Sequence, residues 1–191
     1  MAINYKFDYL VYIGRFQPFH LAHMETINIA LKYSNQIILA LGSAQKERNI
    51  KNPFFAEERE TMILSNFSLA DQARIKFVHV QDVYDDEKWR KLVKSLVVDL
   101  VESNAKIGLI GHFKDESSYY LKFFPEWEML ELESLKNAIS ATPLREAYYQ
   151  GEIKEQDFPS GTIEFLKKFK STDIFKQLQT KFKDQDKTNL V

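Results

Sequence analysis

Short apolar runs alternate with longer amphipathic segments along most of this sequence. Continuous apolar runs are typical of buried strands, and apolar residues spaced by three and four indicate helices. Repeated strand–helix–strand units imply a mostly parallel sheet with right-handed crossovers and helices on both faces, which is an α/β fold. The predicted strands cover residues 9–13, 36–42, 75–80, 106–111 and 127–132, and the predicted helices cover 21–34, 56–69, 87–103 and 115–124.

A further short helix is predicted from the segment TPLREAYYQG. Thr142 is the predicted N-cap, Pro143 the first helical residue and Gly151 the residue just past the end. Two more helical stretches follow, around 161–169 and 173–183. We therefore expect a main domain and a helical C-terminal extension packed on it, with bounds 1–150 and 151–191.

The composition limits the kinds of partner and chemistry. The 26 Lys and Arg residues nearly balance the 27 Asp and Glu residues, so a nucleic acid is not expected as the main partner. The absence of cysteine excludes disulfides, thiol nucleophiles and thiolate-bound metals. No apolar run reaches membrane-spanning length, and the first residues lack the pattern of a signal peptide. The expectation is a soluble cytoplasmic protein that acts on small molecules, with its oligomeric state left open.

The segment GRFQPFHLAH, residues 14–23, directly follows the first predicted strand. In an open parallel sheet, ligands bind beyond the carboxyl ends of the strands. Gly14 lets the backbone approach a ligand closely, and a helix that begins near His20 favours an anion at its amino end. His20 and His23 would lie near one face of that first turn, where imidazoles can donate to phosphate oxygens. Two capping or partly buried histidines are the alternative.

Two separated motifs decide between these interpretations. GRFQPFHLAH together with ISATPLR, residues 139–145, resembles the HxGH and ISxTxxR signatures of the nucleotidyltransferase superfamily, whose fold is Rossmann-like. The segments 42–63, 80–89 and 108–125 further resemble the nicotinamide-nucleotide adenylyltransferases of the archaeal type. The transferase domain of bacterial bifunctional adenylyltransferase/Nudix proteins is the most similar branch, and the resemblance covers about residues 8–150.

The sequence departs from the family pattern at three positions. Ala22 replaces the glycine of HxGH and is expected to be tolerated, because alanine is small and favours a helix. Phe55 stands where a hydroxyl residue is common, and Asp86 where asparagine is common. The acidic Nudix signature GX5EX7REUXEEXGU does not occur, so the hydrolase activity is not expected of this sequence, whether or not a Nudix domain is fused to the natural chain.

The resemblance implies adenylyl transfer from ATP to nicotinamide mononucleotide, giving NAD and pyrophosphate. The catalytic residues implied are His20, His23 and Arg145. Mg²⁺ would be held mainly by the ATP phosphates, because it keeps several waters and needs few protein ligands. No protein metal ligand is therefore predicted. The residues implied to bind ATP are Gly14, Arg15, Phe16, Gln17, Ser140, Thr142 and Arg145.

The same resemblance implies a mononucleotide site. Trp89 would stack on the pyridinium ring, with a packing anchor on its helix as the alternative. Asp82 and Asp86 would orient the carboxamide or a ribose, with a solvated acidic turn as the alternative. The residues implied to bind the mononucleotide are Arg15, Ser43, Lys51, Asn52, Asp82, Asp86, Trp89 and His112.

Three other functions stay open at this stage. The acceptor could be another phosphomonoester, such as phosphopantetheine, or glycerol or choline phosphate with CTP. The chain could be a nucleotide sensor without turnover, or a structural protein in which the motifs are accidental.

Overall fold

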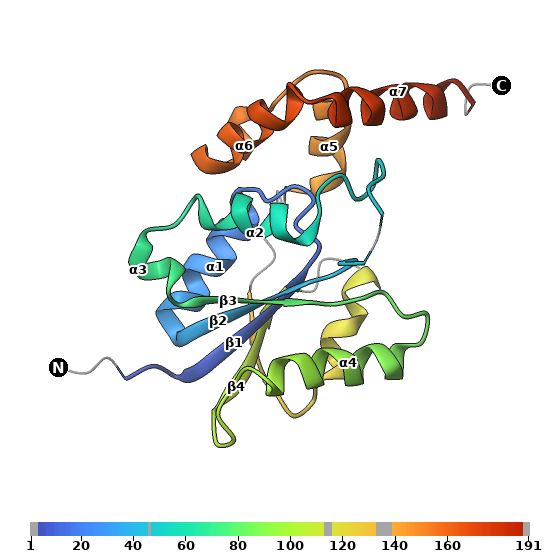
Figure 1. The fold of residues 1–191 in the computed structure, drawn as a ribbon. Helices are drawn as coiled ribbons and strands as arrows, with labels where there is room; N and C mark the ends of the chain where they lie inside the picture. Colours follow the sequence, from blue (N-terminus) through green and yellow to red (C-terminus); the bar gives the residue numbers. More distant parts are fainter. Residues whose placement is uncertain (1–3, 46, 113–115, 133–138, 189–191) are drawn as a thin grey trace. The chain divides into compact units, whose positions relative to one another are not determined.

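A computed structural model describes residues 4–45, 47–112, 116–132 and 139–188. Its sheet, as far as the described residues show, has five parallel strands in the order β3-β2-β1-β4-β5 (Figure 1). All five agree with the apolar runs of the sequence. The strands are β1 Phe7–Gly14, β2 Ser34–Leu41, β3 Ile75–His79, β4 Ile107–Gly111 and β5 Glu128–Glu131.

The helices also follow the amphipathic segments, but one helix type and several helix ends differ; the helix predicted over 87–103, for example, ends at Val98. The segment around 115–124 forms a 3₁₀ helix, η1, rather than an α-helix. The helix predicted over 56–69 ends earlier, because Ser68 caps a separate short helix by accepting from the Asp71 N–H. The helices are α1 Leu21–Tyr33, α2 Ala56–Leu64, α3 Leu69–Gln72, α4 Asp86–Val98, η1 Glu116–Phe123, α5 Ala141–Tyr149, η2 Glu155–Asp157, α6 Ser160–Lys170 and α7 Asp173–Thr188.

Internal contacts divide the chain into two compact units, which we describe separately. The sheet unit comprises Met1–Arg15, Ala22–Gln45 and Phe67–Ala138. The helical unit comprises Phe16–Leu21, Lys46–Asn66 and Ile139–Val191. The expected domain boundary at residue 150 stays a prediction.

In the sheet unit, helices cover both faces of the sheet. Alternate residues of a strand point to opposite faces, and Val11 of β1 packs in one buried cluster with Val93 and Val97 of α4. Helix α1, which buries Ile27 and Leu31, lies on the other face (Figure 1). The predicted α/β class, a Rossmann-like parallel sheet, is therefore confirmed.

The helical unit holds α5, α6 and α7, three helices that the sequence also predicts as helices. The Tyr148 hydroxyl of α5 donates to the Leu166 carbonyl of α6 at 2.8 Å. The Tyr148 ring lies 4.6 Å from the ring of Phe175 in α7. Buried aromatic rings thus join the three helices.

The start of α5 differs from the sequence prediction. Ser140 rather than Thr142 is the N-cap, so the helix begins at Ala141 and Pro143 lies within its first turn. Proline is tolerated there because the first amides of a helix have no intrahelical partner. The helix end agrees with the prediction, since Gly151 follows the C-cap with a φ of 97° that favours glycine.

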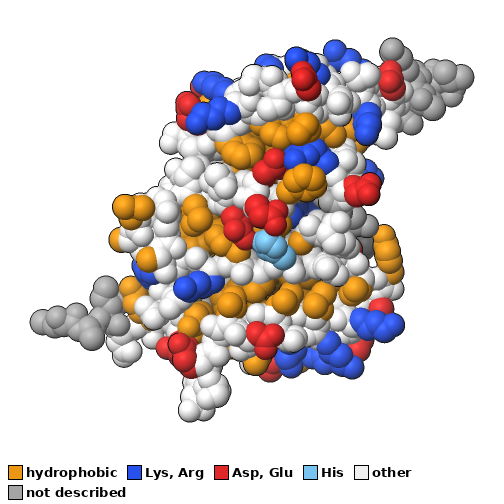
Figure 2. All heavy atoms as spheres, viewed as in Figure 1, with side chains coloured by type: hydrophobic (Ala, Val, Ile, Leu, Met, Phe, Trp, Pro, Cys, Tyr) orange, Lys and Arg blue, Asp and Glu red, His pale blue; other side chains and the backbone are white. Residues whose placement is uncertain are grey.

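The surface carries both signs of charge. Figure 2 shows basic and acidic side chains interspersed on the face in view, in line with the net charge of −1. Across the part of the chain that the structure describes, no helix is long and apolar enough to cross a membrane.

Candidate active site

The histidine motif occupies the connection between β1 and α1. β1 ends at Gly14 and α1 begins at Leu21, so the helix starts directly after His20, as predicted. His20 is only 1% exposed, whereas His23 in the first turn of α1 is half-buried. The His23 ring lies 6.3 Å from the ring of Tyr12 in β1. The two imidazoles therefore stand at the amino end of a 13-residue helix, whose dipole favours an anion.

Two residues of the predicted site have left-handed backbone conformations. Phe16 and Ser43 both have a φ of 52°. This conformation costs a non-glycine residue on the order of 1 kcal/mol, and such strain is concentrated at functional sites. The strained residues follow β1 and β2, close in sequence to the carboxyl ends of two interior strands.

Within the helical unit, Gln17 is buried and forms hydrogen bonds to two other segments of the chain. Its side-chain Nε2 donates to the Phe54 carbonyl at 2.8 Å, and its Oε1 accepts from the Phe54 amide at 3.1 Å. Its own carbonyl accepts from Nη1 of Arg145 at 2.8 Å. One residue thus joins the histidine motif to the segment before α2 and to α5.

Arg145 lies in α5 and is 7% exposed. Besides its bond to Gln17, its Nη2 lies 3.5 Å from Oγ1 of Thr142. Ser140 and Thr142 are exposed around the start of the helix. Within the helical unit, the bond between Arg145 and Gln17 therefore links the two motifs, although these two residues are 128 positions apart in the sequence.

Three predicted mononucleotide residues follow the carboxyl ends of strands in the sheet unit. Ser43 follows β2, Asp82 follows β3 and His112 follows β4. The Ser43 hydroxyl donates to Oδ1 of Asp82 at 3.2 Å. The Gln45 side chain accepts from the Asp82 amide at 2.9 Å and donates to its carbonyl at 3.1 Å. These bonds hold Asp82 against the segment after β2, a link that sequence spacing does not reveal.

The start of α4 carries two more predicted residues of this group, Asp86 and Trp89. Asp85 is the N-cap and accepts from the Lys88 amide at 2.8 Å, so Asp86 is the first helical residue. The Tyr119 hydroxyl donates to Asp86 at 3.3 Å. An aspartate directly before a helical run is a sequence signature of an N-cap, and Asp85 fits it. The hydrogen bond from Tyr119 to Asp86 has no such signal in the sequence.

Trp89 is half-buried in an aromatic cluster. Its ring lies 5.9 Å from Tyr120 and 6.1 Å from Phe124, both with edge-to-face geometry. The packing contacts that the sequence offered as an alternative are therefore present. These contacts fix the orientation of the indole. The side chain is also partly exposed, which is compatible with a role in binding.

Lys51 and Asn52 lie on a tight turn of the helical unit. The Asn49 side chain accepts from the amides of both residues at 2.9 Å. Lys51 is exposed, whereas Oδ1 of Asn52 is buried and has no hydrogen-bond partner among the described residues. A buried acceptor without a donor is costly, and a ligand hydroxyl or amino group would satisfy it.

Arg15 is exposed directly after β1. The described residues contain no group of three His, Cys, Asp or Glu side chains placed to hold a metal ion. A surface depression of the helical unit is lined by none of the predicted site residues; its lining is Ile153, Glu155, Lys167, Lys170 and Ser171.

Comparison with known proteins identifies the family. The sequence model of the cytidylyltransferase-like family matches residues 11–147, which include both motifs. The chain belongs to this family. It is 66% identical over 187 residues to an Acinetobacter baylyi protein named nicotinamide/nicotinic acid mononucleotide adenylyltransferase, covering 98% of this chain and 100% of the relative. It is 30% identical to the nicotinamide-nucleotide adenylyltransferase of Thermoplasma volcanium, covering 90% and 93%. The resemblance to nicotinamide-nucleotide adenylyltransferases of the archaeal type is confirmed.

Solved structures agree with this assignment. A bifunctional NMN adenylyltransferase/ADP ribose pyrophosphatase from Francisella tularensis, complexed with AMP and a manganese ion, is 36% identical with a TM-score of 0.83. The match covers 91% of this chain and 52% of the Francisella chain. The family member described here therefore spans about half the length of that protein, while it covers the full length of the Acinetobacter relative.

Proposed function

We propose that this protein transfers the adenylyl group of ATP to nicotinamide mononucleotide, forming NAD and pyrophosphate. The observation that carries the proposal is the 66% identity over the full length of a relative named for this activity. The histidine motif at the start of α1 and Arg145 in α5 support it, because both present hydrogen-bond donors suited to phosphate.

In the proposed mechanism the protein aligns the two substrates and stabilises the developing charge. It does not need to activate the nucleophile. The mononucleotide phosphate is already an anion at neutral pH, so its oxygen attacks the α-phosphorus of ATP without a strong general base. The bond between the α-phosphorus and the oxygen that bridges to the β-phosphate breaks, and this oxygen leaves with pyrophosphate. His20, His23 and Arg145 donate to the triphosphate and stabilise charge that develops on the transferred and departing groups. The amides at the start of α1 act in the same direction.

We propose that ATP enters as its Mg²⁺ complex. The Francisella protein is complexed with AMP and a manganese ion, which supports a divalent cation alongside the nucleotide. The described residues supply no cluster of three ionisable ligands, and Mg²⁺ needs few protein ligands when phosphates hold it. Bound in this way, the cation would neutralise phosphate charge, while the donors of this chain would orient the triphosphate.

The proposal is tested by NAD formation. Purified protein is incubated with ATP, Mg²⁺ and nicotinamide mononucleotide, and NAD is detected by a coupled alcohol dehydrogenase reaction. We expect turnover with a kcat of about 1 s⁻¹ or more, the lower end of the usual range for enzymes. Phosphopantetheine and choline phosphate, the latter with CTP, serve as control acceptors. Turnover with a control acceptor but not with the mononucleotide, or ATP binding without turnover, would contradict the proposal.

Nicotinic acid mononucleotide is a second candidate acceptor, because the name of the Acinetobacter relative includes it. The two mononucleotides differ in a carboxamide or carboxylate on the pyridinium ring. A carboxylate such as Asp82 or Asp86 near this group would accept from the amide and repel the acid. We therefore propose that the nicotinamide form is preferred.

The preference is tested with variants of residues that are proposed to bind the mononucleotide. Trp89→Ala should raise the KM for nicotinamide mononucleotide by about tenfold, because an aromatic–cation contact is worth about 0.5–2 kcal/mol, and should leave the KM for ATP nearly unchanged. Asp82→Asn or Asp86→Asn should narrow the ratio of kcat/KM values for the two mononucleotides. Trp89→Phe is the matched control, since it keeps an aromatic face. An effect of Trp89→Ala on ATP alone, or an unchanged ratio in both aspartate variants, would show that the site is misplaced.

A further inference from the structure

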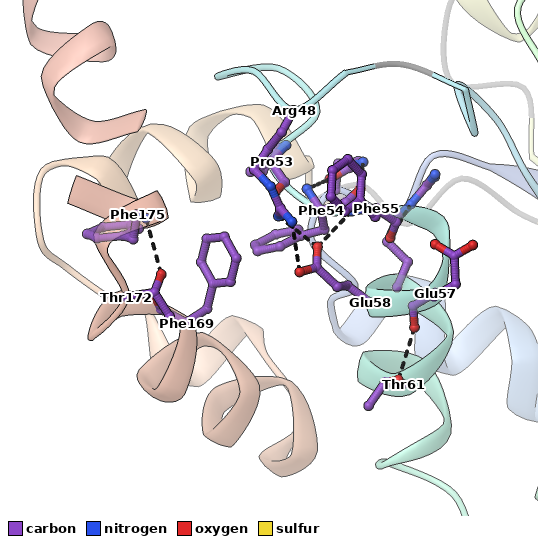
Figure 3. Close-up of polar contacts among 12 residues, drawn as sticks. Arg48, Pro53, Phe54, Phe55, Glu57, Glu58, Thr61, Phe169, Thr172 and Phe175 are labelled. Atoms are coloured by element: carbon purple, nitrogen blue, oxygen red, sulfur yellow. Dashed lines mark hydrogen bonds and ion pairs between the residues drawn. The ribbon is translucent and has the colours of Figure 1, made fainter. Parts of the chain in front are cut away.

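Arg48 closes a short loop in the helical unit, residues 48–53, by bonding to the far end of the loop. Its Nη1 donates to the Pro53 carbonyl at 2.5 Å and lies 2.7 Å from one carboxylate oxygen of Glu58. Its Nη2 donates to the other oxygen of Glu58 at 3.0 Å. Figure 3 shows the guanidinium directed from the loop toward Glu58 in α2. This is the two-pronged geometry that arginine makes with a carboxylate and that lysine cannot reproduce.

Two aromatic rings and a helix cap reinforce this arrangement. The guanidinium carbon of Arg48 lies 4.0 Å from the ring centre of Phe55 and 5.4 Å from that of Phe169. Glu58 also accepts from the Phe55 amide at 2.8 Å at the start of α2. The Arg48 side chain is only 13% exposed, so solvent screens its ion pair with Glu58 less than it screens an ion pair on the surface. Arg48, Phe55 and Glu58 thus hold one another at the helix start.

The loop closed by Arg48 contains the turn that carries Lys51 and Asn52. Asn49 accepts from the amides of these two residues within the turn. On the other side, the Tyr149 hydroxyl of α5 donates to the Ile50 carbonyl at 3.0 Å. Burial raises the pKa of Tyr149, so its hydroxyl stays protonated and keeps donating. The backbone of the turn is therefore held from both ends and from α5.

We propose that Arg48 is a positioning residue for mononucleotide binding: by closing the loop from Arg48 to Pro53 it fixes the turn that presents Lys51 and Asn52 to the phosphate-bearing substrate. This inference rests on the proposed function. Lys51 is exposed and its amide donates to Asn49, so the fixed turn sets the point from which its side chain reaches the substrate. Arg48 acts through the turn and does not contact the substrate.

The test is a double-mutant cycle between Arg48 and Lys51. Arg48→Ala should raise the KM for nicotinamide mononucleotide by about tenfold and change the KM for ATP by less than about twofold. In a Lys51→Ala background the same substitution should raise this KM by a clearly smaller factor, because the part of its effect that acts through Lys51 is already lost. Arg48→Lys should recover only part of the loss, since an ammonium group cannot bond Pro53 and both oxygens of Glu58. An unchanged KM in Arg48→Ala, or the same factor in both backgrounds, would overturn the proposal.

Arg74→Ala is the matched control. Arg74 also bonds backbone carbonyls, those of Leu31, Ser34 and Asn35 at 2.7–2.8 Å, but at the amino end of β2. Its loss should lower the melting temperature without raising the KM for the mononucleotide. An equal rise in that KM for Arg74→Ala would show that Arg48 affects stability in general.

A second measurement does not depend on activity. The amides of Lys51 and Asn52 donate to Asn49, so hydrogen exchange in a peptide that spans residues 47–55 reports the order of the turn. Exchange there should accelerate by about tenfold in Arg48→Ala and stay unchanged in Arg74→Ala. Unchanged exchange in Arg48→Ala would overturn this inference even if the wild-type protein made NAD. An inactive wild-type protein with accelerated exchange in Arg48→Ala would contradict the proposed function instead.

Discussion

His23→Ala is expected to lower the kcat for NAD formation by about tenfold or more, a loss of at least about 1.4 kcal/mol of transition-state stabilisation. His23 lies in the first turn of α1, where its imidazole and the helix amides would act on the same phosphates. Because the side chain is only half-buried, the variant should keep its fold. Steady-state kinetics with both substrates and a thermal melt provide the measurement.

Three further variants separate catalysis from stability. His20→Ala should also slow turnover, but it removes a side chain that is 1% exposed and should lower the melting temperature as well. His23→Asn keeps hydrogen-bond donors on its amide nitrogen and should retain more activity than His23→Ala. His79→Ala is the control, since His79 is exposed at the end of β3 and has no proposed role. Near-normal rates for His23→Ala with unchanged ATP affinity would remove His23 from the mechanism.

The three interior strands β2, β1 and β4 were predictable because each holds a continuous apolar run, as a sheet covered on both faces requires. The strand order β3-β2-β1-β4-β5 was not, because it depends on pairing between segments far apart in sequence. Helix ends were harder to predict: Ser140 and Thr142 both suit an N-cap, and Ser140 takes that position. The 3₁₀ geometry of η1 likewise has no signal in the spacing of its aromatic residues.

The residues of the candidate site were predictable from short motifs, but their supporting contacts were not. Ser43 and Asp82 are 39 residues apart, and their hydrogen bond depends on the parallel pairing of β2 and β3. Phe55 stood out in the sequence only as a departure from the family. In the structure its ring lies against Arg48, a contact that requires the folded loop. The structure thus adds the groups that hold the motif residues in place.

Arg145→Lys is expected to raise the KM for ATP and lower kcat, each by about tenfold, even though the charge is retained. Arg145 already donates through Nη1 to the Gln17 carbonyl, which places its guanidinium beside the backbone of the histidine motif. The planar fork allows an arginine to keep such a bond while other N–H groups approach the triphosphate. A lysine ammonium, a compact point charge, does not have this geometry.

The bond to Gln17 also predicts a loss of stability, and the measurement must separate the two effects. Breaking a buried charge-assisted hydrogen bond costs about 1.5–3 kcal/mol, so Arg145→Lys should melt at a lower temperature. ATP affinity is therefore measured by calorimetry well below the melting temperature of the variant. Arg74→Lys is the control, because it weakens bonds to backbone carbonyls at the amino end of β2. If Arg145→Lys binds ATP and turns over as the wild type does while melting earlier, Arg145 only holds the Gln17 backbone, and the leaving pyrophosphate is stabilised by other donors.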